Sequence, residues 1–230
     1  MNTFFIIISC LITIIILKLG LDIKYKEMKK LNDRGTEEIR KIAKKFPDSK
    51  TMCEQLLKKM QIKDVKVKID GQSNNCLYTV FNKTILIGKF KEEYMKLQTI
   101  AHECIHASQN KKILWANFII SNIYNIYFLV IIIMALFNRI NHFSEIIFTL
   151  ILLGTVQYVI RNYLENEAMQ KAKFLAKEYI EENNICTLEE KKRLIQEYEA
   201  VNEIGIPFIN YITIQNNLIR IIICSIIFLI

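Results

Sequence analysis

Residues 99–137 read TIAHECIHASQNKKILWANFIISNIYNIYFLVIIIMALF and join the two features that decide the fold. The first feature is a polar segment that contains His-Glu-Cys-Ile-His. The second is residues 113–137, which carry no charged side chain. A run of this length and composition is long enough to cross the hydrocarbon core of a bilayer as a helix. We therefore expect a membrane protein whose polar part carries the chemistry.

Three other apolar segments accompany this run: residues 4–21, 146–160 and 204–230. The 230-residue chain is 52% hydrophobic and 23% charged, with two prolines and six glycines, which disfavours disorder and many-turned β folds. Because no basic residue precedes the first segment and no small-residue cleavage site follows it, we expect an uncleaved anchor. The last segment is expected to be a fourth span whose polar residues face other helices.

The net charge of +8 gathers beside the apolar segments. Lys24 and Lys26 follow the first segment, Lys111 and Lys112 precede the second, and Arg161 closes the third. Basic residues that flank spans on one side are typical of the cytoplasmic side of a multi-pass protein, here of a bacterial cell membrane. Aromatic residues do not interleave with these lysines, so we expect the lipid bilayer as a partner and no nucleic acid.

Periodicity in the polar part predicts an α+β fold that is mainly helical. Apolar residues at helical spacing predict helices, and strict alternation predicts a strand with one face buried. The predicted helices are residues 36–45, 49–60, 92–106 with an extension toward the second span, and the charged stretch 164–203; the predicted strands are residues 64–70, 77–80 and 84–87.

The strongest chemical signal is the motif formed by His102, Glu103 and His106. Two histidines four residues apart lie on one face of a helix, where both can bind a single Zn²⁺ ion. Glu103 lies between them and is suited to accept a proton from the water that such an ion activates. Cys104, inside the motif, points away from the ligand face and is expected to pack in the core.

A zinc site of this type needs a third protein ligand. The chain returns to the cytoplasmic side after the third apolar segment, where Glu165 and Glu167 begin a helical stretch. Both are suitably placed by proximity, and both are equally compatible with solvated acids at a helix start, which the helix dipole favours. The residues alone leave this choice open.

The order of anchor, polar α/β segment, Ala-His-Glu-x-x-His-Ala, two spans and Glu-x-x-Ala resembles the bacterial neutral zinc metallopeptidases, small membrane proteins similar to the CAAX prenyl and heat-shock membrane proteases. The Gly71-Gln72 pair and the Asn82-Lys83 turn add weaker support. The resemblance implies a zincin-like domain and one Zn²⁺ per chain. It also implies His102, His106 and Glu165 as ligands, Glu103 as the catalytic base, and a peptide or protein substrate, membrane-associated or not.

The resemblance also divides the chain. It implies an anchor (1–22), a cytosol-facing zincin-like domain (23–112), a transmembrane hairpin (113–162), a helical segment with the third ligand (163–203) and a C-terminal membrane segment (204–230). One departure is Met169, which stands where relatives carry a polar residue that can orient a ligand. This chain would then need another donor.

The expected function is a membrane-embedded zinc endopeptidase that hydrolyses peptide bonds. The alternative, favoured by Met169 alone, is a catalytically silent metal-binding membrane scaffold. A small transporter lined by Arg220, Asn117 and Asn125 would explain the polar residues in the spans but not the motif. The sheet of residues 64–87 is equally compatible with binding substrate as an added strand and with a structural role. Substrate identity, oxyanion donor, regulation and oligomeric state stay open.

Overall fold

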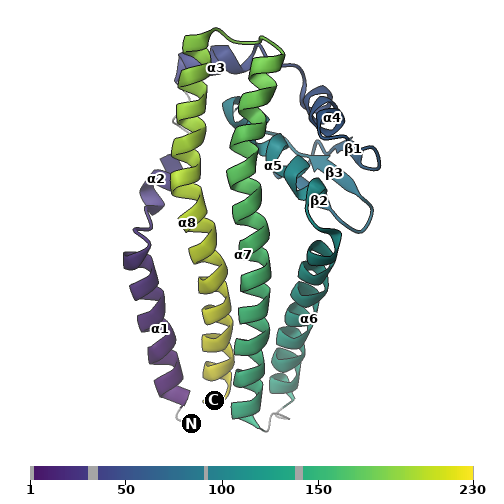
Figure 1. The fold of residues 1–230 in the computed structure, drawn as a ribbon. Helices are drawn as coiled ribbons and strands as arrows, with labels where there is room; N and C mark the ends of the chain where they lie inside the picture. The colour runs from purple at the N-terminus through teal and green to yellow at the C-terminus, as the bar shows by residue number, and fades with distance from the viewer. Residues whose placement is uncertain (1–2, 31–35, 91–92, 138–141, 230) are drawn as a thin grey trace. The chain divides into compact units, whose positions relative to one another are not determined.

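The computed structural model describes residues 3–30, 36–90, 93–137 and 142–229 (Figure 1). These residues are mostly helical with one three-stranded sheet, which confirms the predicted mainly helical α+β composition. The chain forms two compact units. Unit 1 comprises Met1–Ile23, Lys112–Tyr163 and Pro207–Ile230, and unit 2 comprises Lys24–Lys111 and Leu164–Ile206.

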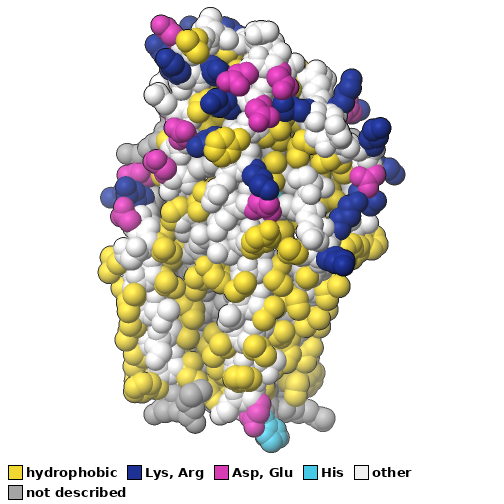
Figure 2. Space-filling view, viewed as in Figure 1, with side chains coloured by type: hydrophobic (Ala, Val, Ile, Leu, Met, Phe, Trp, Pro, Cys, Tyr) yellow, Lys and Arg dark blue, Asp and Glu magenta, His cyan; other side chains and the backbone are white. Residues whose placement is uncertain are grey.

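Unit 1 contains helix α1 (Thr3–Gly20), nearly all of α6 (Lys111–Leu136), the first half of α7 (Phe143–Glu182) and the second half of α8 (Leu188–Ile227). Of these, α1, α6 and α7 are long and apolar enough to cross a membrane by length and composition. Large hydrophobic side chains stay exposed along them, including Phe5, Ile126 and Phe148, and Figure 2 shows such side chains covering the surface of these helices. Exposure on this scale is typical of a surface that faces lipid.

The core of unit 1 is small and is contributed by all four helices. It consists of Cys10, Tyr124, Ile131, Ile147, Leu150, Ile221 and Cys224. Gly154 of α7 allows close helix packing, because a Cβ atom there would lie 3.1 Å from the hydroxyl of Tyr124 and 3.3 Å from the side-chain amide of Asn217. The same amide donates to the Gly154 carbonyl oxygen at 2.8 Å. Small residues serve this purpose at helix interfaces in membranes.

Unit 2 is built on a sheet with strand order β1-β3-β2. The strands are β1 (Lys66–Ile69), β2 (Leu77–Thr79) and β3 (Thr84–Ile87). Strand β3 pairs in parallel with β1 and antiparallel with β2, so β1 and β2 are the two edges. The central strand is the buried one: Ile85 and Ile87 are almost completely inaccessible to solvent.

The helices of unit 2 are α2 (Tyr25–Lys30), α3 (Glu37–Ala43), α4 (Ser49–Lys59), α5 (Lys96–Ser108) and the remaining halves of α7 and α8. Local sequence fixes where two of them begin. The Thr36 hydroxyl accepts from the Ile39 N–H, and the Asp48 carboxylate accepts from two N–H groups at the start of α4. Helix α5 is tied to α8 by Gln98, whose Nε2 donates to Asn202 Oδ1 at 2.8 Å.

Three predictions about helix boundaries are corrected by the structure. The helix predicted over residues 92–106 begins with a 3-10 turn (Glu93–Met95) and ends at Ser108, so it does not run into the second apolar segment. The charged stretch 164–203 is not one helix, since α7 ends at Glu182 and α8 begins at Leu188. Residues 204–230 do not begin a helix of their own, because α8 continues through Pro207.

The break between α7 and α8 has a local cause. Asn184 has a left-handed backbone (φ 49°), which asparagine tolerates better than most residues and which commonly ends a helix. Thr187 and Glu190 then cap α8 reciprocally: each side chain accepts a hydrogen bond from the other residue's backbone N–H, at 3.0 and 3.3 Å. This is a capping box, and the Thr-x-x-Glu pattern was readable in the sequence.

Two further expectations concern exposed parts of the chain. The alternation over residues 64–70 predicts one buried face, but Val67 is only partly buried and Ile69 is 64% exposed, because β1 is an edge strand. The outer turn predicted over residues 138–145 lies partly outside the described residues. Helix α8 is not among the three helices that meet the length and composition expected of a span, so the fourth span stays a prediction.

Candidate metal centre

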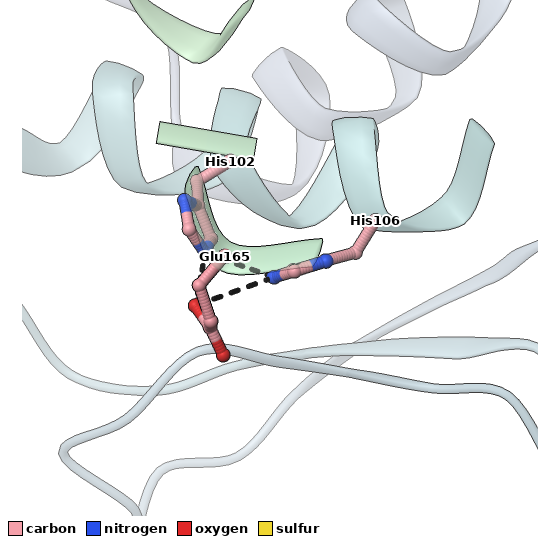
Figure 3. A group of neighbouring side chains, drawn as sticks. All are labelled: His102, His106 and Glu165. Atoms are coloured by element: carbon pink, nitrogen blue, oxygen red, sulfur yellow. Dashed lines mark hydrogen bonds and ion pairs between the residues drawn. The ribbon is translucent and has the colours of Figure 1, made fainter. Parts of the chain in front are cut away.

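Helix α5 presents His102 and His106 on one face, one turn apart, as their spacing predicts. Their rings stand edge to face with centroids 4.5 Å apart, and the two Nε2 atoms are 2.9 Å apart. Figure 3 shows both rings converging on the carboxylate of Glu165. All three side chains are largely buried, with exposed fractions of 14 to 20%.

Glu165 comes from the second half of α7. Its Oε2 lies 3.4 Å from His102 Nε2 and 3.8 Å from His106 Nε2. Of the two glutamates that the residues alone left open, the structure brings Glu165 to the histidine pair. Among the described residues, this trio is the one group of three ligand-type side chains whose donor atoms converge in this way.

The three donor atoms fit a divalent metal ion. The centre of the triangle formed by the three donor atoms, whose sides are 2.9, 3.4 and 3.8 Å, lies about 2.0 Å from each atom, which is the usual length of a zinc–nitrogen or zinc–oxygen bond. Two imidazoles and one carboxylate would hold such an ion with three protein ligands and would leave a further coordination position for water or substrate. The trio could therefore hold a metal ion in an open site.

Gln109 fixes the orientation of His106 and was not recognised from the sequence. Its Oε1 lies 2.8 Å from His106 Nδ1, while its Nε2 donates to the Leu164 carbonyl oxygen (2.8 Å) and to Glu167 Oε2 (2.9 Å). Since those two oxygens only accept, the amide nitrogen must face them and the amide oxygen must accept from Nδ1–H. His106 Nε2 then keeps its lone pair for a metal ion.

The same amide connects the two helices that supply the ligands. Gln109 directly follows α5 as its C-cap and is only 7% exposed, and Leu164 directly precedes Glu165. One side chain therefore links His106 to the turn of α7 that carries Glu165. A glutamine three residues after the second histidine is the signal that could have identified it.

Glu167 belongs to the surroundings of the centre. Its carboxylate accepts from Gln109 and from Lys171 Nζ, the latter at 2.5 Å. The hydrogen bond from Lys171 is the main reason that the pKa of Glu167 is lowered, so the carboxylate stays charged and can accept from Gln109. Glu167 is therefore connected to His106 by way of the Gln109 side chain.

Met169 does not supply the polar partner that the sequence resemblance led us to expect at this position. It is buried, and its backbone oxygen accepts from Asn202 Nδ2 at 2.9 Å. Its side chain packs beside Gly205, where an added Cβ would lie only 2.8 Å from the methionine Cε. A polar partner for one histidine comes from Gln109 instead.

Glu103 is 6% exposed and its carboxylate is anchored to strand β2, where Oε2 accepts the N–H of Tyr78 at 2.6 Å. Burial raises its pKa, although the two histidines and the Tyr78 N–H act in the opposite direction. Burial lowers the pKa of His106, but its hydrogen bond to Glu165 and the nearby carboxylates outweigh burial and raise it. A carboxylate with a raised pKa is a better proton acceptor near neutral pH.

Cys104 lies in the core. It is fully buried, and its Sγ is 3.8 Å from Sγ of Cys53 on α4. The contact with Cys53 and burial raise the pKa of the Cys104 thiol well above its usual value, which keeps it protonated. A protonated buried thiol packs as a small apolar group and is a poor metal ligand.

Comparisons with the models of known protein families, with curated proteins and with solved structures find no match to this chain.

Proposed function

We propose that this chain is a membrane-embedded, zinc-dependent endopeptidase. The convergence of His102, His106 and Glu165 around a point about 2.0 Å from each donor atom carries the proposal. Glu103 beside the histidines supplies the base that hydrolysis needs. Zinc is the metal we propose because this donor set with one open position is typical of zinc hydrolases. The sequence resemblance to bacterial neutral zinc metallopeptidases with a zincin-like domain agrees with it.

The residues of the chain divide the work of hydrolysis. A bound zinc ion would polarise the scissile carbonyl group and lower the pKa of a water molecule. Glu103 moves the proton: Oε2 is held by Tyr78, so Oε1 is the oxygen that takes the proton from the attacking water and passes it to the leaving amine. Gln109 keeps His106 in the tautomer that binds metal.

The test compares single variants of the purified full-length protein. Glu103→Gln should retain about one metal equivalent and lose hydrolysis of a quenched fluorescent peptide by about 10²- to 10⁴-fold, the usual share of a general base. His106→Ala should lose both metal and activity. Glu189→Gln, which changes an exposed acid outside the centre, is the control. A metal-loaded wild type without hydrolysis of any peptide in a diverse library would favour the silent metal-binding scaffold.

We further propose a multi-pass protein of a bacterial cell membrane with the metal centre on the cytoplasmic side. The support is the apolar character of α1, α6 and α7, together with the lysines that follow α1 and those that begin α6. Single cysteines at Lys192 and His142 test this orientation, in a background where the partly exposed Cys76 and Cys186 are serine. A membrane-impermeant thiol reagent should label the His142 site from outside the cell and the Lys192 site only after permeabilisation; the opposite pattern would invert the topology.

A further inference from the structure

A groove of about 590 Å³ lies in unit 2 between helix α4 and the residues that lead into and form strand β1. Its apolar floor includes Leu57, Val65 and Val67. Strand β1 is separated from the β2 edge, where Glu103 is anchored, by the central strand β3. None of the residues that line this groove belongs to the candidate metal centre, so the two are separate sites. We call this feature of unit 2 the α4–β1 groove.

The backbone of β1 is unpaired on the side that faces away from β3. The Lys66 N–H donates to the carbonyl oxygen of Lys83, directly before β3, at 2.9 Å, and the Asp70 N–H donates to that of Ile87 in β3 at 2.8 Å. Because successive residues of a strand point their backbone groups to opposite sides, Val67 and Ile69 direct N–H and C=O away from β3. No backbone partner for these groups occurs in the described part of the chain. This edge can accept one more strand.

The groove is also strongly basic. Four lysines line it, Lys50, Lys58, Lys63 and Lys66, against a single acid, Glu54. Only Lys50 has a carboxylate nearby among the described residues, and that contact with Glu54 is exposed and 3.8 Å long. Figure 2 shows dark blue side chains gathered over the region of α4 and the strands.

We propose that the α4–β1 groove binds an extended acidic peptide segment, which adds to β1 as a fourth strand. Its acidic side chains would pair with the groove lysines, and alternate apolar side chains would lie on the floor. Charge decides against a second copy of this chain as the occupant, since its own β1 edge carries the same lysines. The unpaired N–H and C=O groups favour a peptide over lipid headgroups, because an extended peptide presents N–H and C=O groups at the repeat of a strand and a headgroup does not.

The test uses the full chain in neutral-lipid nanodiscs with Glu103→Gln in every arm, so that peptide binding is measured without hydrolysis and independently of the proposed activity. The probe is a fluorescein-labelled peptide of alternating glutamate and valine, and the control peptide has lysine for glutamate. The acidic peptide should bind, and its affinity should fall with added salt. Bound peptide should slow hydrogen exchange in residues 64–70. The lysine peptide should not bind.

Two groove variants separate charge from strand pairing. Lys63→Glu with Lys66→Glu should weaken binding by about tenfold or more, since each reversal replaces an attraction with a repulsion. Val67→Pro should weaken binding to a similar extent, because it removes an outward N–H that the sheet does not use. Lys192→Glu, an exposed lysine outside the groove, should change little.

Three results would overturn the proposal. Full affinity in Val67→Pro would exclude strand addition, and equal weakening by Lys192→Glu would show unspecific charge attraction. Absence of peptide binding, together with flotation on phosphatidylserine vesicles that Lys63→Glu with Lys66→Glu abolishes, would assign the groove to the membrane surface. Exchange protection of residues 64–70 is read in the protein without groove substitutions, so the outcome does not depend on the proline variant folding.

Discussion

The two units each gather polar side chains from distant parts of the sequence, but they do so differently. In unit 2, the amide oxygen of Gln109 accepts from His106, and its nitrogen donates to the backbone next to Glu165 and to Glu167. Each contact thus involves a metal-centre residue or one of its close neighbours in the chain. In unit 1, Arg220 donates to Asn125 Oδ1 at 2.7 Å and lies over the rings of Tyr124 and Phe128.

The arrangement of the polar groups separates the two clusters. In unit 2, the donor atoms of His102, His106 and Glu165 converge on one point, whereas the polar groups of Arg220 and Asn217 in unit 1 join pairs of helices. Convergence is what a metal needs, while scattered hydrogen bonds between helices are what association in a membrane needs. Variants should therefore change metal binding in one unit and stability in the other.

The largest effect is expected from Glu165→Ala, which removes a direct ligand. Metal affinity should fall by more than the roughly 10- to 100-fold typical of residues that only orient a ligand. Glu167→Ala is the matched control two residues along the same helix, and it should lower affinity only slightly, through Gln109. Competition titration with a chromophoric chelator measures both. Equally large losses in the two variants would show that metal binding depends on Glu167 as much as on Glu165, which contradicts Glu165 as the single carboxylate ligand.

A smaller effect on the same measurement is expected from Gln109→Ala. The change leaves all three ligands in place but frees His106 Nδ1 and the Leu164 carbonyl oxygen, so metal affinity should fall by about 10- to 100-fold. In protein loaded with Co²⁺, the visible spectrum should change as the ligand geometry relaxes. Gln109→Glu, which can still accept from Nδ1–H, should recover part of the affinity. An unchanged Co²⁺ spectrum in Gln109→Ala would limit this residue to packing.

The sequence predicted that His102 and His106 lie on one face of a helix with Glu103 between them, because residues four apart in a helix share a face. It could not choose between Glu165 and Glu167 by residue pattern, since both follow the third apolar segment and the choice depends on the rotation of α7 against α5. Gln109 was missed for the same reason: its partners Leu164 and Glu167 are more than fifty residues away. Contacts within a helix turn can be predicted, whereas contacts between helices need the packing.

The fold follows the same rule. Helices α3 and α4 were predicted to within two residues because their apolar spacing and capping residues are local. The buried face expected for β1 was wrong, because alternation cannot reveal that the strand lies at an edge of the sheet. The break between α7 and α8 was missed although Thr187 and Glu190 form a capping box, since the charged residues around it also suit one continuous helix.

The smallest effect on metal binding, and a clear effect on stability, is expected from Arg220→Met. Methionine keeps most of the side-chain length but loses the hydrogen bond to Asn125 and the cation–π contacts with Tyr124 and Phe128, whose ring centroids lie 4.5 and 5.2 Å from the guanidinium carbon. Contacts of these kinds contribute about 0.5–2 kcal/mol each, so unfolding in detergent should occur at lower temperature.

The matched variant is Arg220→Lys, which keeps the charge without the planar guanidinium group. Its unfolding temperature should lie between those of wild type and Arg220→Met. Metal affinity should stay within about twofold of wild type, because Arg220 shares none of its contacts with the metal-centre residues, and variants without shared partners act independently. A loss of metal affinity comparable to that of Gln109→Ala would show that the two polar clusters are coupled, and it would remove the distinction between a cluster that joins helices and one that forms a site.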